Sequence, residues 1–470
     1  MKKTKIIATS GPASDNKEVI KEMIENGTDI IRVNMAYASH DFLEKINKIV
    51  SELNKELNKN VSIMVDISGP SVKIGHIDGK GAYLNKSDKI RIYEDAVIGN
   101  STRFNVDYKY LLEDVKVNTT LKINDGLVEL LVIDKGHDYL LCEVIEGGYI
   151  EEGAKINIVG LKLNMPFLTE KDKEDILYAS KLHVDYLALS HVSTHEDVLE
   201  VNDLLINYND SHMTLISKIE SAYALDDLDE IIKVSDGVMV ARGDLGVELP
   251  IERIPGVQKI IIKKCHYLGK VSILATEMLS SMEERVRPTR AEVSDVANAV
   301  LDGVDAVMLS GETTVGRYPK EVVTTLARIL ETEEEEMNYF ELQSDASRTE
   351  RQDTTGAIAY SVVEASKKLR AKAIVTPTMS GYTARKISRF RPNAIILAMS
   401  PDIDTVKSLN IYYGVYPVLI NNVKSFDEMI SVAKSKAAKE LSLKDEKIII
   451  TGGYPLKEVK HTNFMKIEEL

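Results

Sequence analysis

The stretch that decides the fold is residues 215–248, LISKIESAYALDDLDEIIKVSDGVMVARGDLGVE. It begins with a short apolar run that ends in Lys218 and Glu220, which lie on the same face of a strand. One helix later, a second apolar run ends in Arg242, a glycine and Asp244. Two neighbouring parallel strands that end in carboxylates offer oxygen ligands to a Mg²⁺-type ion, with Lys218 close by for an anionic substrate. The alternative is a pair of buried strands capped by solvated charges, and the repetition of the pattern argues against it.

Short apolar runs alternate with amphipathic stretches on both sides of this segment, which is typical of a parallel sheet covered by helices. The expected strands cover residues 6–8, 29–34, 61–67, 186–190, 214–219, 237–241, 271–275 and 306–309. Eight strands predict a (β/α)₈ TIM barrel, a fold that places its chemistry at the C-terminal ends of the strands. The polar residues that fall at those ends are Arg32, Asn34, Asp66, Lys218, Glu220, Asp244 and Thr276.

Two further domains are indicated by changes in this pattern. Short strands separated by turns such as Asn124-Asp125-Gly126 predict an inserted small β-barrel domain. After the acidic run Glu333–Glu336, interpreted as a solvated helix end and linker, the alternation predicts a smaller α/β domain. We therefore expect a catalytic barrel of residues 1–70 and 160–340, a lid of residues 71–159 over the active site, and a regulatory or oligomerisation domain of residues 345–470.

Composition restricts the partners and the location. The chain has 470 residues and a formal net charge of -14, which argues against nucleic acid and anionic membrane as partners. Cys142 and Cys265 are too few for a disulfide framework, so a reducing, cytoplasmic location is expected. No apolar run reaches the roughly 18 residues of a membrane span. The histidines and cysteines show no zinc pattern, so a transition-metal site is not expected.

A hydroxyl-rich loop in the C-terminal domain has the character of a phosphate site. Its candidate residues are Thr378, Ser380, Gly381 and Thr383, which lie between an expected strand and an expected helix. A capped turn explains the same residues equally well. No stretch has the GxxxxGK[ST] spacing of a P-loop.

Five stretches together resemble the pyruvate kinase family. They are residues 4–14 (TKIIATSGPAS), 216–220 (ISKIE), 239–248 (MVARGDLGVE), 288–298 (PTRAEVSDVAN) and 309–313 (LSGET). The resemblance covers nearly the whole chain, in the family's domain order. It implies a glycolytic, ATP-binding enzyme that transfers the phosphoryl group of phosphoenolpyruvate to ADP, giving ATP and pyruvate. It also implies Mg²⁺ or Mn²⁺ as cofactor and a homotetramer in the cytoplasm.

The resemblance assigns roles by motif position. Glu220 and Asp244 would hold the divalent ion, while Lys218 and Arg32 would neutralise the phosphoryl group in transfer. Thr276 would bind the substrate carboxylate and help to relay the proton, and the backbone N–H groups of Gly243 and Asp244 would bind that carboxylate too. The residues that match nucleotide-binding positions are Pro12, Arg32, Asn34 and Asp125.

Departures from the family concentrate on the side of the expected site that would bind the monovalent cation and the nucleotide. The usual Asn-Phe-Ser-His reads Asn34-Met35-Ala36-Tyr37, and the usual Asp-Thr reads Asp66-Ile67. Only Asn34 and Asp66 remain of the side chains that bind a monovalent cation in the family, so K⁺ activation at that site is not expected. The other departures are Ser68, Ser71, Lys73, His191, Ser193 and Glu277. The C-terminal effector loop at residues 456–463 is poor in glycine, which argues against activation by a sugar phosphate.

Two alternatives stay open at this point. The chain could be a Mg²⁺-dependent decarboxylase, tautomerase or lyase on 2-oxo acids that has lost the kinase step, because the substitutions avoid the metal side. It could instead be a non-catalytic regulatory paralogue, which the intact Lys218 disfavours.

Overall fold

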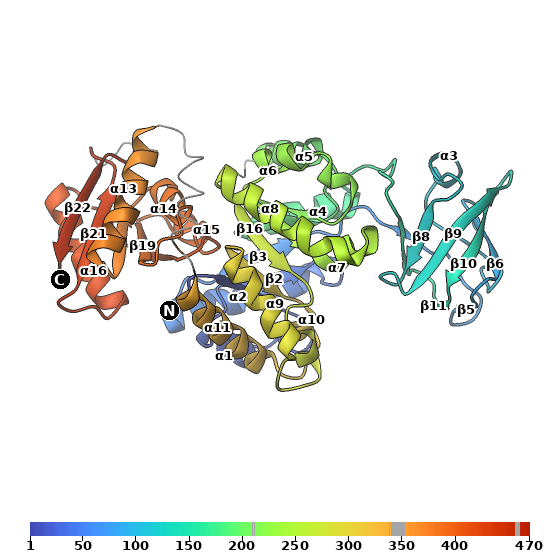
Figure 1. Cartoon of the computed structure of the whole chain (residues 1–470), viewed down its shortest axis with the longest axis horizontal. Helices are drawn as coiled ribbons and strands as arrows, with labels where there is room; N and C mark the ends of the chain where they lie inside the picture. Colours follow the sequence, from blue (N-terminus) through green and yellow to red (C-terminus); the bar gives the residue numbers. More distant parts are fainter. Residues whose placement is uncertain (209, 211, 338, 340–352, 456–460) are drawn as a thin grey trace.

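Eight parallel strands close into a barrel at the centre of the molecule (Figure 1). The computed structural model describes residues 1–470 except 209, 211, 338, 340–352 and 456–460. The barrel strands are β1 (Lys5–Thr9), β2 (Ile30–Asn34), β3 (Ser62–Asp66), β13 (Tyr186–Leu189), β14 (Thr214–Ile219), β15 (Gly237–Ala241), β16 (Val271–Ala275) and β17 (Ala306–Leu309). They pair in the order β1-β17-β16-β15-β14-β13-β3-β2. The (β/α)₈ prediction is confirmed.

The helices of this domain surround the barrel, because their apolar stripes pack against the outer faces of the strands. The α-helices are α1 (Lys17–Glu25), α2 (His40–Leu57), α4 (Glu170–Lys181), α5 (His195–Asn207), α6 (Leu228–Val234), α7 (Arg242–Glu248), α8 (Ile254–Leu268), α9 (Arg290–Leu301), α10 (Gly311–Thr314) and α11 (Pro319–Glu336). Short 3₁₀ turns lie at η1 (Tyr223–Leu225), η2 (Ile251–Arg253) and η3 (Ser280–Glu283). Thr169 and Asp172 form a capping box that starts α4.

The segment between β3 and α4 forms a separate β domain, drawn at the right of Figure 1. Its elements are β4 (Val72–Lys73), β5 (Ala82–Leu84), β6 (Lys89–Tyr93), β7 (Arg103–Asn105), α3 (Leu111–Asp114), β8 (Thr120–Ile123), β9 (Val128–Lys135), β10 (Tyr139–Glu146), β11 (Gly148–Ile150) and β12 (Lys155–Ile158). Seven strands pair in the order β4-β12-β8-β9-β10-β6-β7, and β11 pairs with β5. A bridge between Ile74 and Val106 joins the two edges of the seven-stranded sheet, so the domain is the small barrel that the turns predict.

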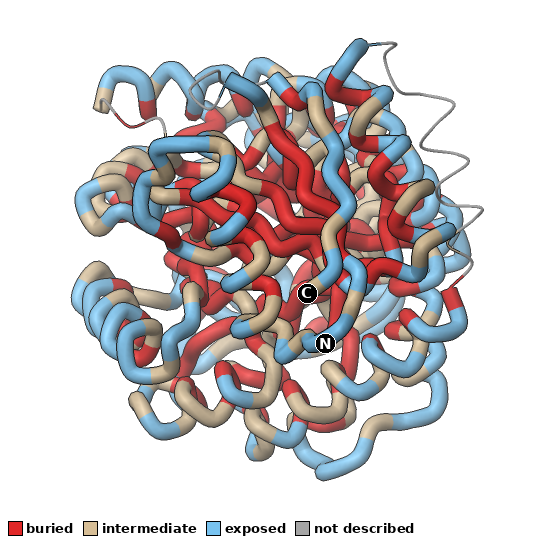
Figure 2. The backbone as a smooth tube through the Cα atoms, turned by 90° about the vertical axis from the view of Figure 1, so that its left-hand side faces the viewer, coloured by how far each residue is buried: buried red, intermediate tan, exposed pale blue. Residues whose placement is uncertain are grey.

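The C-terminal domain is a five-stranded sheet with the order β20-β19-β18-β21-β22. Its elements are α13 (Thr354–Leu369), β18 (Ala373–Pro377), α14 (Tyr382–Ser388), β19 (Ile395–Ser400), α15 (Ile403–Ser408), β20 (Val415–Leu419), α16 (Phe426–Glu440), β21 (Lys447–Gly452) and β22 (Phe464–Glu469). Figure 2 looks onto this domain and shows buried strands running through its middle. The antiparallel edge strand β22 was not predicted, because its residues are mostly exposed and lack an apolar run.

The C-terminal domain seals one end of the barrel. The buried Tyr186 on β13 donates a hydrogen bond from its hydroxyl to the Lys407 carbonyl at 2.8 Å, and the same hydroxyl accepts one from the Ile411 backbone N–H at 3.2 Å. Inward-facing barrel residues and apolar residues of the C-terminal domain form one continuous core. The C-terminal domain therefore covers the end of the barrel where the strands begin, and the C-terminal ends of the strands lie at the opposite end.

The acidic run at the end of α11 corrects one expectation. Glu334 is not solvated: it is buried, and its carboxylate accepts hydrogen bonds from the backbone N–H groups of Lys3 at 2.8 and 2.7 Å and of Thr4 at 2.6 Å. Buried backbone donors need acceptors, and this carboxylate supplies them at the start of β1. The rest of the expected linker falls largely on residues 340–352, which lie outside the described residues.

A buried ion pair fastens the barrel to the C-terminal domain. Arg391 donates to the two carboxylate oxygens of Asp305 at 2.6 and 2.9 Å. Burial alone raises the pKa of Asp305, but the Arg391 guanidinium outweighs it and lowers the pKa. Asp305 therefore stays ionised in the folded protein at a pH where the unfolded chain has begun to take up a proton.

We expect this pair to make the protein sensitive to acid. The pKa of Asp305 is lower in the folded protein than in the unfolded chain, so the stabilisation is fully present above the unfolded pKa of about 3.9. As the pH falls from the unfolded pKa to the folded pKa, the free energy of unfolding decreases by about 1.4 kcal/mol per pH unit. Urea unfolding of the wild type and of Asp305→Asn between pH 6 and about pH 3 measures this loss of stability. Asp305→Asn should be less stable than the wild type at pH 6 but should lose less stability than the wild type on acidification. Equal losses of stability in the two proteins would contradict the prediction.

Two features of the described residues bear on location and redox chemistry. No helix among them combines the length and the apolar character needed to cross a bilayer. Both cysteines are free and buried, Cys142 in the core of the inserted domain and Cys265 on α8.

Candidate active site

Lys218 lies at the centre of a buried charged cluster where β14 ends. Its Nζ is 2.8 Å from Glu220 Oε1 and 3.4 Å from Asp66 Oδ1, and it donates a hydrogen bond to Ser190 Oγ at 2.7 Å. Burial alone would favour the neutral amine, but the carboxylates of Asp66 and Glu220 outweigh it and raise the pKa of Lys218. The neighbouring carboxylates thus favour the charged form of Lys218 at the C-terminal end of the barrel.

Arg32 approaches the same cluster from β2. Its Nε donates to Asp66 Oδ2 at 2.8 Å and a terminal nitrogen lies 2.7 Å from that oxygen, while another nitrogen donates to Thr9 Oγ1 at 2.9 Å. Both Arg32 and Asp66 are buried. Asp66, which the sequence analysis placed in a degraded K⁺ site, is therefore the common anchor of two cationic side chains.

The two predicted metal carboxylates pair with different lysines, Glu220 with Lys218 and Asp244 with Lys155. Glu220 Oε2 accepts hydrogen bonds from the backbone N–H of His191 at 2.7 Å and from its Nδ1 at 2.9 Å. Asp244, on the first turn of α7, pairs with Lys155 Nζ at 2.9 Å, and this lysine is also 3.2 Å from His191 Nε2. Burial tends to raise the pKa of Glu220, but Lys218 and His191 outweigh it and lower the pKa well below its usual value.

This donor set fits a divalent ion. Two carboxylates provide the oxygen ligands that Mg²⁺ and Mn²⁺ prefer. Glu220 is 2% exposed, whereas the side chain of Asp244 is 31% exposed. Asp244 is therefore accessible to solvent, whereas Glu220 is not.

Thr276 and Gly243 meet beside these carboxylates. The Gly243 backbone N–H donates to Thr276 Oγ1 at 2.8 Å, and that hydroxyl donates to the Ala275 carbonyl at 2.6 Å. Thr276 and Glu277 have φ values of 68° and 54°. A left-handed backbone is rare for a β-branched residue and costs about 1–3 kcal/mol, so the end of β16 is strained where the threonine faces the site.

The predicted nucleotide residues are spread over two domains. Asn34, at the end of β2, is the register partner of Asp66, and its Oδ1 accepts from the Ala36 N–H at 3.0 Å. Pro12 is exposed on the loop after β1, and Asp125 is exposed at the turn between β8 and β9. Among the described residues no hydrogen bond or ion pair joins Pro12 to Asp125. The nucleotide assignment stays a prediction.

The hydroxyl loop of the C-terminal domain is internally bonded. Gly381 has a φ of 73° at the start of α14, and the carbonyl of Ser380 accepts from Arg385 at 2.5 Å. Thr383 is buried and its Oγ1 lies 2.8 Å from that of Thr462. Residues 456–460 of the expected effector loop lie outside the described residues, so the effector site, including Thr378, stays a prediction.

Sequence reasoning missed three residues that contact the predicted site. Ser190 is the last residue of a predicted strand and His191 follows it, so the strand-end rule that selected Lys218 could have selected them. Lys155 carried no such signal, because it belongs to the inserted domain and meets Asp244 only in the folded chain.

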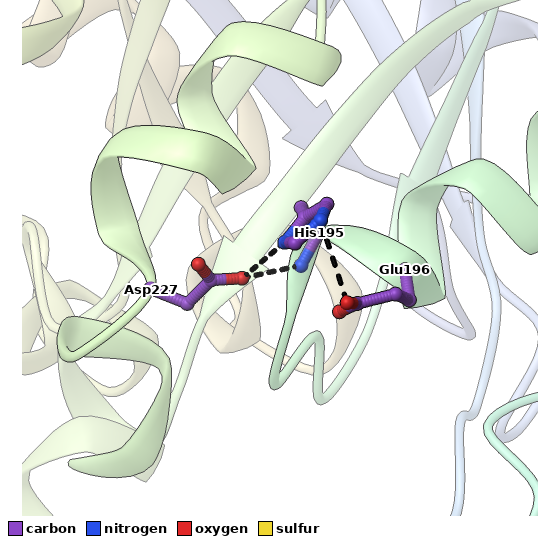
Figure 3. A group of neighbouring side chains, drawn as sticks. All are labelled: His195, Glu196 and Asp227. Carbon is purple, nitrogen blue, oxygen red and sulfur yellow. Dashed lines mark hydrogen bonds and ion pairs between the residues drawn. The ribbon is translucent and has the colours of Figure 1, made fainter.

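A separate group of titratable side chains lies at the starts of α5 and α6 (Figure 3). His195 Nδ1 is 2.8 Å from Asp227 and its Nε2 is 3.4 Å from Glu196. The hydrogen bond to Asp227 raises the pKa of His195. Because each ring nitrogen faces a carboxylate, the contacts are explained by ion pairing at the start of α5.

Two family models match most of the chain. The family model described as the pyruvate kinase barrel domain matches residues 1–323, and the one described as the pyruvate kinase alpha/beta domain matches residues 356–468. The chain is 39% identical over 470 residues to a pyruvate kinase of Staphylococcus haemolyticus, covering 99% of this chain and 80% of that protein.

Two further relatives span almost their whole length. A pyruvate kinase of Clostridium acetobutylicum is 37% identical over 100% of this chain and 99% of its own. The crystal structure of a pyruvate kinase from Cryptosporidium parvum superposes with a TM-score of 0.95 at 34% identity, covering 100% of this chain and 96% of that one. The chain therefore belongs to the pyruvate kinase family of phosphotransferases.

Proposed function

We propose that this protein transfers the phosphoryl group of phosphoenolpyruvate to ADP, giving ATP and pyruvate, with Mg²⁺ or Mn²⁺ as cofactor. The bond between phosphorus and the enol oxygen breaks, a bond to a β-phosphate oxygen of ADP forms, and the enolate carbon then takes up a proton. Phosphoryl transfer depends mainly on positioning and charge neutralisation.

The observation that carries the proposal is the buried ammonium of Lys218 between Asp66 and Glu220. It would neutralise the charge on the phosphoryl group in transfer, and Arg32, fixed on the same Asp66, would act from the other side. Both cations are held before substrate arrives, so little reorganisation is needed in the transition state.

Groups next to Asp244 in the chain and at the end of β16 would bind the substrate carboxylate. The Gly243 N–H and the Thr276 hydroxyl, 2.8 Å apart, would bind it together with the backbone N–H of Asp244. Thr276 Oγ1 would help to deliver the proton to the enolate carbon. Glu220 and Asp244 would hold the divalent ion, which supplies further charge neutralisation to the substrate oxygens.

Activity without K⁺ is part of the proposal. Asp66 already contacts Arg32 and Lys218, and neither Ala36 nor Ile67 has a side-chain oxygen for a monovalent ion. The positive charge that K⁺ would contribute near Asp66 is thus contributed by the protein.

A steady-state assay that couples pyruvate formation to lactate dehydrogenase tests both parts. With phosphoenolpyruvate, ADP and Mg²⁺ we expect turnover that EDTA abolishes. We expect the same rate when KCl is replaced by tetramethylammonium chloride. Absence of pyruvate in every condition would refute the kinase, whereas a strict need for K⁺ would refute only the second part.

The two alternatives from the sequence analysis are not favoured by similarity to pyruvate kinases over the full chain. Calorimetry separates them further, since a lyase on 2-oxo acids would bind oxaloacetate but not ADP. A homotetramer in the cytoplasm stays a prediction from the family resemblance, and light scattering measures the number of copies.

A further inference from the structure

One histidine at a position where the chain departs from its family contacts a predicted metal ligand. His191 lies shortly after the end of β13 and has a left-handed backbone, with a φ of 60°. Its backbone N–H donates to Glu220 Oε2 at 2.7 Å, and its Nδ1 is 2.9 Å from the same oxygen. Such a backbone is uncommon outside glycine and is concentrated at functional sites. Here it accompanies the convergence of two nitrogens of one residue on a single carboxylate oxygen.

The neighbours of the imidazole ring determine which of its nitrogens carries the proton. An ionised carboxylate can only accept, so Nδ1 donates to Glu220. An ammonium can only donate, so Nε2 accepts from Lys155 Nζ at 3.2 Å. The ring also lies against the backbone of Gly69, where an added Cβ would be 3.3 Å from His191 Cδ2. The imidazole is therefore held from several sides as an oriented hydrogen-bond donor to Glu220.

The contacts of Glu220 distinguish its two carboxylate oxygens. A carboxylate has about four lone-pair sites, two on each oxygen. The two N–H groups of His191 take both sites on Oε2, and Lys218 Nζ, 2.8 Å away, takes one on Oε1. Among the contacts of the described residues, the second site on Oε1 receives no donor. A divalent ion that binds Glu220 is thereby directed to Oε1.

We propose that His191 is a positioning residue for the divalent ion, because its two N–H groups occupy Glu220 Oε2 and present Oε1 to the ion. It acts through Glu220 and does not itself bind the ion. Hydrogen-bond partners that orient a metal ligand typically change metal affinity by about 10–100-fold when they are replaced. The inference rests on the proposed function for the assignment of Glu220 as a metal ligand.

Three replacements of His191 separate the contacts of its ring. His191→Phe keeps a ring and removes both nitrogens. In His191→Asn the amide nitrogen is as many bonds from the backbone as Nδ1, so it keeps a donor for Glu220, and asparagine tolerates the left-handed backbone. In His191→Gln the amide is as far along the side chain as Nε2, so it keeps an acceptor for Lys155 and loses the donor to Glu220.

Ser193→Ala is the matched control for a change in the same loop. The Ser193 hydroxyl donates to the His191 carbonyl at 3.3 Å, and its listed partners among the described residues do not include Glu220. A residue that only stabilises this loop would affect metal binding no more in one position than in the other. Thermal unfolding of all four variants establishes that each is folded and measures any general loss of stability.

Mn²⁺ binding to the purified full chain without substrates, followed by electron paramagnetic resonance, tests the proposal. We expect His191→Phe and His191→Gln to bind Mn²⁺ about tenfold more weakly than the wild type, because Glu220 loses an orienting donor. His191→Asn and Ser193→Ala should bind Mn²⁺ like the wild type. In the coupled assay, the Mn²⁺ concentration that gives the half-maximal rate should rise by the same factor in the two weakened variants.

The outcomes separate the positioning role from the proposed function. If the wild type binds no Mn²⁺, the metal site of the proposed function is wrong and the role of His191 falls with it. If the wild type binds Mn²⁺ and His191→Gln binds it equally well, or His191→Asn binds it as weakly as His191→Gln, the positioning role is wrong and the proposed function stands. These two variants decide the question even if His191→Phe does not fold.

Discussion

Replacing Lys218 with methionine lowers kcat for pyruvate formation by about 10³-fold or more, because several kcal/mol of transition-state stabilisation disappear with the ammonium. Methionine fills a similar volume, so the barrel end keeps its packing while Asp66 and Glu220 lose a cation. The coupled assay at saturating Mg²⁺ measures the loss, and circular dichroism establishes that the variant is folded.

Lys171→Met provides the matched control for this variant. Lys171 also lies near the strand ends, where it donates to the Met35 carbonyl at 2.7 Å, but its side chain is 54% exposed and contacts none of the predicted catalytic groups. It should retain the wild-type rate. Mn²⁺ binding should survive in Lys218→Met, because Glu220 and Asp244 remain. A Lys218→Met protein that keeps about a tenth of the wild-type kcat, a barrier change of only about 1.4 kcal/mol, would remove the ammonium from the mechanism.

Asp66→Asn is expected to cost both stability and activity. Removing one partner of a buried ion pair typically costs about 3–5 kcal/mol, because the charge left behind is uncompensated. Here two cations, Arg32 and Lys218, lose the same carboxylate. Thermal unfolding should shift to lower temperature, and the folded fraction should show a reduced kcat because neither cation is held in position.

A second buried carboxylate separates these two effects. Asp172 is buried near the same end of the barrel and accepts from the backbone N–H groups of Ser68 and Gly69 at 3.1 and 3.2 Å, but it pairs with no catalytic cation. Asp172→Asn should lower the unfolding temperature and leave kcat of the folded protein close to that of the wild type. Equal kcat values for the two variants would mean that Asp66 has only a structural role.

Much of the fold could be predicted from the sequence, because parallel strands covered by helices are near-continuous apolar runs. The barrel strands β14, β15, β16 and β17 begin and end at the predicted residues. The edge strand β22 escaped because it is exposed and lacks such a run. Glu334 was misinterpreted because its partners lie about 330 residues earlier in the chain, and charge patterns report only local neighbours.

The candidate site was predictable to the extent that strand ends converge in a barrel. Lys218, Glu220, Asp66 and Arg32 come together because β14, β3 and β2 all present their C-termini at one end. The contact of Lys155 with Asp244 depends instead on how a second domain packs on α7. Apolar periodicity carries no information about such a contact.

The two buried cysteines have a practical consequence. Burial raises the pKa of the Cys142 thiol to about 12 and also raises that of Cys265. The thiolate is the species that attacks maleimides and peroxides, so at neutral pH we expect both cysteines to be unreactive toward these reagents. Fluorophores can therefore be attached to cysteines newly introduced on the surface without first removing the natural ones. The distance between two domains can then be followed molecule by molecule.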